Sequence, residues 1–344
     1  MRVTAIDPIS NPAWLELVER SAEATAFHTP AWAAVLRDTY GFQPEYLVAF
    51  ENEAPVAGIP LFRVGDRLVG APFSDFCPPL SLKEETGTRL LEAAKQRIDG
   101  NGTQALEIRG DAAIDLAAAD LRLGDSFIRH VIPLHKGMQE IDRLLHDSAR
   151  RAVKKARKES ISVRVSTSLD DMRLFYRLNA LTRKKHGLIP QPWSFFRNIQ
   201  RHHMETGSGW LLLADHNGET IAGDLLLACK DKLVYKFNAS DPRHLGLRPN
   251  NLLLYSAIEF GVERGFSEFD LGRCEEDNEG LRRFKLLWGS EEVPLNYYYY
   301  PRKSTGGSRI TSNRVARRLL PVFVRFAPVW ALSLAGGLLY RKFA

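Results

Sequence analysis

The sequence has few cysteines, and their spacing argues against two common kinds of stabilising site. Only Cys77, Cys229 and Cys274 occur in 344 residues. An odd number without a CxxC pair is not typical of a disulfide framework or of a structural zinc site. We therefore expect reduced thiols and a cytoplasmic setting.

Motifs of two catalytic classes are also missing. No GxSxG sequence marks a serine hydrolase. The histidines form no HxxxH or HExxH pattern of the kind that binds metal; those considered are His28, His130, His202, His203 and His244. We predict no metal site and no permanently bound cofactor.

Long apolar runs are absent too. The N-terminus lacks the apolar segment of a signal peptide. Residues 302–318 are polar and basic, and within 319–344 the longest uncharged run, 326–340, has 15 residues. A bilayer crossing needs roughly 20. Because flanking Arg and Lys residues suit an anionic leaflet, we expect 319–344 to make peripheral contact with the inner membrane. A helix folded back over the core is the alternative.

The composition is that of a globular protein, with 44% hydrophobic and 26% charged residues. Its length indicates two domains. The net charge of +6 is concentrated in 150–158 and after residue 300. This clustering favours an anionic partner.

The stretch 146–160 is the densest basic block and is predicted to be a helix. On such a helix Arg150, Lys154 and Arg157 share one face, and Arg151, Lys155 and Lys158 share the next. Few acids are available for salt bridges, so we predict that the block binds phosphates. A solvated helix that keeps the protein soluble is the alternative.

The order of predicted elements occurs twice, which indicates two domains of one fold, 1–145 and 161–301, joined by the basic helix. Helices are expected at 11–21, 28–40 and 83–99, with three strands in 45–72 and others at 103–110 and 126–135. The second copy has expected helices at 168–187, 192–207 and 250–265, three strands in 210–240, and strands at 266–272 and 293–300. Both are α/β (α+β) units with mixed, largely antiparallel sheets flanked by helices.

Four stretches carry a family resemblance. They are HTPAWAAVLRDTYGF near the start, SARRAVKKARK at the junction, GLRPNNLLLYSAIEFGVERGFSEFDLGR, and GLRRFKLLWGSEEVPLNYYYY. With this element order, they resemble Fem-type (FemAB-like) aminoacyl transferases, which contain two tandem GNAT-like domains. The resemblance covers most of residues 1–300 and extends to relatives in exopolysaccharide and exosortase gene clusters.

The resemblance implies an activity. Such enzymes move an acyl or aminoacyl group from aminoacyl-tRNA or an acyl thioester, such as acyl-CoA, to an amine of a peptidoglycan or exopolysaccharide precursor. The expected partners are therefore a lipid- or nucleotide-linked envelope precursor and tRNA. Two alternatives remain open: an acyl-CoA-dependent N-acyltransferase of exopolysaccharide sugars, and a non-catalytic polysaccharide-assembly or nucleic-acid-binding protein that reuses the fold.

Lys285 is the principal catalytic candidate. It stands among apolar residues in LRRFKLLWG, and the resemblance implies that the Lys of this Phe-Lys pair acts near the reacting group. A fixed cation stabilises the negative charge that builds on a carbonyl oxygen during acyl transfer. A lysine that merely covers an apolar surface is the alternative. Trp288 in the same motif is grouped with the substrate-binding residues.

Other candidate site residues lie at the ends of predicted strands. Asn238 in KFNASD is predicted to face the acyl site between the central strands, or else to belong to a turn before Pro242. Asp270 is a candidate general base, with Arg273 beside it as a substrate ligand. The alternative is an ion pair between these two residues.

The stretch RHLGLRPNN at 243–251 partly matches the acetyl-CoA signature. Arg243 and Gly246 fit, whereas Arg248 stands where a small residue belongs and would obstruct a pyrophosphate. All three are candidate phosphate ligands, as is Asn250, which could instead cap the next helix. The first domain has no FKLLWG counterpart and offers only Arg37 and Asp75.

Overall fold

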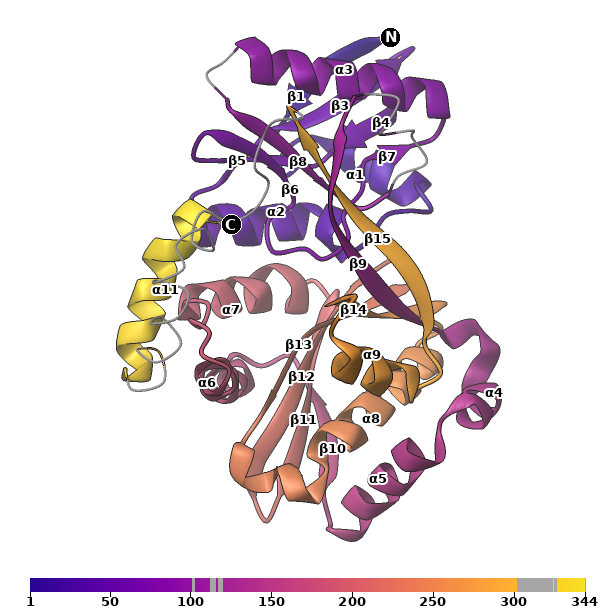
Figure 1. Ribbon diagram of the computed structural model, residues 1–344, viewed down its shortest axis with the longest axis vertical. Coiled ribbons are helices and arrows are strands. Elements are labelled where there is room, and N and C mark those ends of the chain that lie inside the picture. Colours follow the sequence, from indigo (N-terminus) through magenta and orange to yellow (C-terminus); the bar gives the residue numbers. More distant parts are fainter. Residues whose placement is uncertain (101–102, 112–115, 117–119, 302–323, 325–326, 344) are drawn as a thin grey trace. The chain divides into compact units, whose positions relative to one another are not determined.

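The computed structural model describes residues 1–344 except 101–102, 112–115, 117–119, 302–323, 325–326 and 344 (Figure 1). The chain divides into two compact units. Unit 1 comprises the described residues of Met1–Ile128, Pro294–Ser312 and Leu339–Ala344, and unit 2 those of Arg129–Val293 and Asn313–Leu338. These units are not the continuous ranges 1–145 and 161–301, because two long strands each contribute residues to both. The expected connecting helix 146–160 lies within unit 2.

Unit 1 begins with strand β1 (Arg2–Ile6), which the sequence analysis did not anticipate. Its helices are α1 (Pro12–Arg20), α2 (Pro30–Tyr40) and α3 (Glu84–Gly100). Its shorter strands are β2 (Gln43–Pro44), β3 (Tyr46–Glu51), β4 (Ala54–Ile59), β5 (Leu61–Val64), β6 (Arg67–Gly70), β7 (Leu80–Ser81) and β8 (Ala105–Arg109). Residues 45–72 thus hold four main strands rather than three.

Two sheets organise unit 1. One has the order β1-β3-β4-β7, and the other runs β9-β15-β8-β6-β5-β2, where β9 is Arg122–Pro133 and β15 is Glu291–Tyr300. Apolar residues of β3, β4, β6, β8 and α3 form a common core. Helix α2 starts as predicted, with Thr29 as N-cap accepting a hydrogen bond from Trp32 N and Pro30 at the first position.

Unit 2 contains most of the candidate residues. Its main helices are α4 (Gly137–Leu144), α5 (Asp147–Lys158), α6 (Leu169–Lys185), α7 (Trp193–Ile199), α8 (Pro249–Glu263) and α9 (Glu279–Leu286). Its strands are β10 (Ser162–Ser166), β11 (Gly209–His216), β12 (Glu219–Cys229), β13 (Lys232–Ser240) and β14 (Glu268–Glu275), followed by β9 in sheet order. Helix α9, which carries Lys285, was not assigned from the sequence.

Helices cover both faces of the sheet of unit 2. Helices α6 and α7 lie on one side of strands β11 to β13, and α8 and α5 lie on the other (Figure 1). Helix α5 is amphipathic: Ala149, Val153 and Ala156 are buried in the core shared with α8. Its six cations all point away from that core and are exposed.

The end of the chain forms helix α11 (Val329–Phe343). In unit 2, Ser333 Oγ accepts a hydrogen bond from Tyr176 Oη at 2.7 Å, and Leu332 is buried beside Ile189. In unit 1, the Tyr340 ring lies 5.5 Å from Phe73. Described parts of the tail therefore pack on folded protein, which is the alternative weighed above, and the predicted linker 302–318 lies outside the described residues. Among the helices described here, none has both the length and the apolar character needed to cross a bilayer.

Candidate active site

Lys285 is buried and held in place. Only 6% of the residue is exposed, and Nζ donates hydrogen bonds to Gly272 O at 2.8 Å and Arg273 O at 3.0 Å. Helix α9 presents it because Asn278 caps the helix, accepting a hydrogen bond from Leu281 N. The expected fixed cation is therefore present, and its catalytic role remains a prediction.

The charge on Lys285 influences a second buried cluster. His130 is fully buried, with Nδ1 3.1 Å from Ser290 Oγ and Nε2 3.4 Å from Cys274 Sγ. Burial, reinforced by the Lys285 ammonium, lowers the pKa of His130 to about 4. His130 is thus neutral at physiological pH.

Strands β13 and β14 separate near Lys285. They pair in parallel only from Lys232 and Glu268 to Val234 and Asp270. On the other side of β13, Phe237 pairs with Leu225 and Tyr235 with Leu226, so Lys236 is the extra residue of a β-bulge. Asn238 lies beyond the point where β13 leaves β14, and its role at the acyl site remains a prediction.

Asn238 faces a carboxylate that the sequence analysis overlooked. Asp224 is fully buried on β12, and its Oδ1 accepts hydrogen bonds from Asn238 Nδ2 at 2.7 Å and Tyr235 Oη at 2.8 Å. Burial raises the pKa of Asp224 to about 7, although both hydrogen bonds oppose this shift. The sequence feature that could have identified Asp224 is a single acidic residue inside the apolar stretch IAGDLLLAC.

The polar network continues to the start of α8. Asn238 Nδ2 lies 3.4 Å from Asn250 Oδ1, and Asn250 Nδ2 donates to Ser240 Oγ at 3.3 Å. Asn250 is not the N-cap, because Arg248 occupies that position in a left-handed conformation (φ 66°). No side chain caps this end of α8 among the described residues, which leaves its amide groups suited to an anion.

A cation-lined cavity of about 420 Å³ adjoins the start of α8. Arg151 and Lys155 of α5 line it, together with Arg248 and Asn251. Phe284 of α9 supplies an apolar wall. We call this space the α8 cavity. It joins one face of the basic helix to the loop that partly matches the acetyl-CoA signature.

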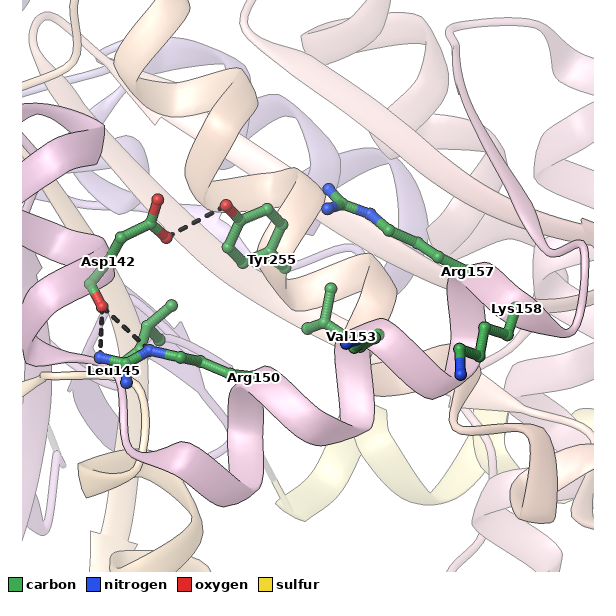
Figure 2. Close-up of a pocket in the computed structure, with 8 residues that line it drawn as sticks. Asp142, Leu145, Arg150, Val153, Arg157, Lys158 and Tyr255 are labelled. Carbon is green, nitrogen blue, oxygen red and sulfur yellow. Dashed lines mark hydrogen bonds between the residues drawn. The ribbon is translucent and has the colours of Figure 1, made fainter.

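The opposite face of α5 borders a second cavity, of about 620 Å³ (Figure 2). Arg150, Lys154, Arg157 and Lys158 line it, opposite Tyr255 of α8. We call it the Tyr255 groove. The helix therefore presents cations to two separate spaces rather than to one continuous surface.

Some of these cations are already engaged. Arg150 donates to the Asp142 carbonyl at 2.6 Å, and the Arg157 guanidinium lies 5.1 Å from the centre of the Tyr255 ring (Figure 2). By contrast, Lys154 and Lys158 have no partner among the described residues. Arg151 and Lys155 of the α8 cavity are likewise without a partner among the described residues, so both faces of α5 offer free cations.

The loop 243–251 contributes less than expected. Arg243 is tied to Asp241 Oδ2 at 2.6 Å and to Glu219 Oε1 at 3.1 Å. A Cβ added at Gly246 would meet nothing within 4 Å, so no close backbone approach requires glycine there. Of this loop, Arg248 and Asn251 line the α8 cavity.

The structure adds partners for three other candidates. Asp270 lies 3.6 Å from Arg129 Nη1 and accepts a hydrogen bond from Gly272 N at 2.7 Å. Arg273 meets Lys285 through its backbone carbonyl. Trp288, grouped from the sequence with the substrate-binding residues, is fully buried in the core of unit 2, so its side chain presents no surface to a substrate.

In unit 1, the weaker candidates have local partners. Arg37 Nε pairs with Asp38 Oδ1 at 3.0 Å, and the Asp75 carbonyl accepts a hydrogen bond from Tyr297 Oη at 2.8 Å. Within the described ranges, no three His, Cys, Asp or Glu side chains gather as metal ligands would.

Comparison with known proteins agrees with this geometry. Residues 145–292 match the acetyltransferase (GNAT) domain family. A lipid II:glycine glycyltransferase of Staphylococcus haemolyticus (strain JCSC1435) is 34% identical over 86 residues, which is 23% of this chain and 20% of that protein. The match therefore spans about a fifth of this curated relative.

Solved structures share the fold over most of the chain. The crystal structure of FemX has a TM-score of 0.69 at 16% identity, covering 86% of this chain and 97% of that one. The L-PGS structure from Bacillus licheniformis has a TM-score of 0.57 at 15% identity, covering 96% and 97%. A tandem GNAT protein from the clavulanic acid biosynthesis pathway has a TM-score of 0.54 at 13% identity, covering 88% and 99%.

The chain thus shares the fold of a tandem GNAT protein, and its residues 145–292 match the acetyltransferase (GNAT) domain family. The partial match to the glycyltransferase and the fold shared with FemX agree with the FemAB-like resemblance of the four sequence motifs.

Proposed function

We propose that the protein transfers an acyl or aminoacyl group from an activated donor to an amine of a cell-envelope precursor. The observation that carries this proposal is the buried Lys285 ammonium, fixed by two carbonyls of β14 where β13 and β14 separate. A cation held in a water-poor position stabilises developing negative charge far better than one in solvent.

In this reaction, the residues of the candidate site stabilise the developing charge and position the donor. The amine attacks the donor carbonyl carbon, and Lys285 faces the oxygen on which charge accumulates. The resulting tetrahedral intermediate collapses to an amide as the bond to the donor oxygen or sulfur breaks, and the proton lost by the amine is taken up by the leaving hydroxyl or thiol. Asn238 and the uncapped end of α8 position the donor, while phosphate-bearing groups occupy the α8 cavity beside Arg151, Lys155 and Arg248.

Aminoacyl-tRNA is the proposed donor, and a lipid-linked peptidoglycan precursor the proposed acceptor. The curated relative is named as a lipid II:glycine glycyltransferase, which supports this choice. A cytoplasmic enzyme that contacts the inner membrane peripherally would meet such an acceptor. One exposed apolar residue of α11, Leu338 at 68%, is available for that contact.

An acyl-CoA donor with an exopolysaccharide amine as acceptor is the second candidate. The specific observation in its favour is the uncapped start of α8 beside Arg248, because backbone amides at a helix N-terminus bind pyrophosphate. A non-catalytic role is less well supported, since Lys285 is buried rather than in open solvent.

The test is a transfer assay with the full chain. Purified protein is incubated with lipid II and either glycyl-, alanyl- or seryl-tRNA or acetyl-CoA, and the amide product is detected by mass spectrometry. A parallel series uses amino-sugar oligosaccharides as acceptors. We expect product with wild type and with Lys136→Met, a change in an exposed surface ion pair, but not with Lys285→Met.

The outcome distinguishes the donors. Transfer from tRNA with an affinity that falls steeply with salt supports the first candidate. Transfer from acetyl-CoA alone supports the second. No product from any combination contradicts the proposed enzymatic function.

A further inference from the structure

Asp224 is a buried acid that the reaction as described does not use. Its Oδ1 accepts hydrogen bonds from the Tyr235 hydroxyl at 2.8 Å and the Asn238 amide at 2.7 Å. Its Oδ2 is buried without a hydrogen-bond partner among the described residues. A structural carboxylate normally has both oxygens satisfied, so this arrangement indicates a group that exchanges a proton.

The position of Tyr235 places this acid beside the strand opening. Pairing between β13 and β14 ends at Val234, so Tyr235 is the first residue of β13 past the paired segment, and the bulged Lys236 follows it. The Tyr235 ring packs edge-on against Phe269 of β14 at 5.9 Å. Its hydroxyl therefore links the opening to the carboxyl behind it.

The surroundings of Asp224 leave its charge uncompensated. Tyr235 of β13 is the titratable group that contacts it, and Asn238 and, beyond it, Asn250 of α8 are neutral. No ion pair to Asp224 exists among the residues described in unit 2. Because burial brings the pKa to about 7, the carboxyl can both accept and return a proton near neutral pH.

We propose that Asp224 acts through the Tyr235 hydroxyl as the proton acceptor of the transfer reaction, an inference that rests on the proposed function. As the new carbon–nitrogen bond forms, the amine proton moves to Tyr235 Oη, and the hydroxyl proton of Tyr235 moves to Asp224 Oδ1. When the carbon–oxygen or carbon–sulfur bond to the donor breaks, the same path returns the proton to the leaving group. Asp224 is thus a positioning and proton-holding residue behind Tyr235.

The experiment measures how the transfer rate depends on pH. For wild type, we expect kcat/KM to rise tenfold per pH unit below about pH 7 and to level off above it. Asp224→Asn and Tyr235→Phe should lose this rise and fall about 10²- to 10⁴-fold in kcat, with donor affinity unchanged within threefold. Tyr176→Phe, which removes a hydroxyl bonded to Ser333 on the other side of the sheet, is the matched control and should behave as wild type.

A second measurement does not depend on activity. In protein carrying ¹³C-labelled aspartate, one carboxyl resonance should titrate near pH 7 and be missing in Asp224→Asn. Absence of that resonance, or an unchanged pH profile in both variants, overturns the inference. If wild type transfers nothing, the proposed function fails instead, and the carboxyl titration alone decides whether Asp224 exchanges a proton at neutral pH.

Discussion

Lys285 holds its charge where water does not screen it. Two backbone carbonyls orient the ammonium, so no reorganisation is needed when an oxyanion forms nearby. Its influence already extends to His130, whose low pKa keeps a second positive charge out of the same region.

Asp224 allows a prediction about stability. Its folded-state pKa of about 7 lies above the usual value of 3.8. The folded protein therefore binds this proton more tightly than the unfolded chain. The resulting stabilisation is fully present below about pH 4 and is lost as the pH rises through 7. Asp224→Asn does not titrate, so its melting temperature relative to wild type should rise between pH 5 and pH 8. The difference corresponds to on the order of 2–4 kcal/mol.

Thermal unfolding monitored by circular dichroism at both pH values checks this expectation. Asp231→Asn, a change on an exposed turn, provides the control and should show no such rise, because the pKa of Asp231 is lowered rather than raised. Equal effects of Asp224→Asn at pH 5 and pH 8 would show that the carboxyl is not the titrating group.

The sequence predicted single residues unevenly. The apolar neighbours of Lys285 correctly indicated a buried lysine. Asp224 was missed because its significance depends on the register of β12 against β13, which sets it opposite Asn238. Trp288 was grouped with the substrate-binding residues although it lies in the core, because a tryptophan beside a predicted catalytic lysine can equally be a core residue. Local patterns report burial, whereas partners come from pairing between distant segments.

Helix α5 presents its cations to two cavities, and this predicts separable effects. Arg151→Ala with Lys155→Ala removes charge from the α8 cavity. KM for the donor should rise about tenfold and the salt dependence of donor binding should weaken by about two ions. Lys154→Ala with Lys158→Ala alters only the Tyr255 groove and serves as the matched control.

Steady-state kinetics at several salt concentrations compare KM for the donor in wild type and in the two double variants. If both double variants raise KM for the donor equally, the two faces of α5 do not act separately. The helix would then attract anions only through its overall charge.

Helix α2 offers a prediction that does not involve catalysis. Thr29 caps this helix through its hydroxyl, so Thr29→Ala should lower the free energy of unfolding by about 1 kcal/mol. Thr29→Ser keeps the hydroxyl and should have little effect. Urea denaturation curves compare the three proteins, and an equal loss for Ala and Ser would rule out the cap as the cause.

Elements with strong local signals were predicted well from the sequence. The capped helix α2, the amphipathic α5 and the meander β11 to β13 appear where their patterns placed them. Strand β1 and helix α9 were missed, because β1 is short and α9 is identified by its cap rather than by an apolar stripe. Duplication of the element order was enough to indicate two GNAT-like units.

At the scale of the whole molecule, chain connectivity could not be read from the sequence. Strands β9 and β15 each contribute residues to both units, so neither unit is one continuous segment. Helix α11 likewise has residues in both. Domain boundaries predicted at loops do not match the compact units where one long strand contributes residues to both.

Close packing of α11 provides a test of this tail. A Cβ at Gly336 would meet the Pro190 carbonyl, whereas one at Gly337 would make an ordinary contact at 3.8 Å with Pro192 Cβ. Gly336→Ala should therefore loosen α11, cost about 1–3 kcal/mol and speed proteolysis near residue 336. Gly337→Ala should be neutral or stabilising. Limited proteolysis with mass spectrometry compares them, and identical cleavage rates would contradict docking of α11 at this glycine.

The central claim concerns Lys285 and the chemical step. The most direct measurement is the rate constant of amide formation under single-turnover conditions with saturating donor, for wild type and Lys285→Met. The account predicts a rate about 10²- to 10³-fold lower in the variant, with an unchanged dissociation constant for the donor. Equal rates in the two proteins would contradict it.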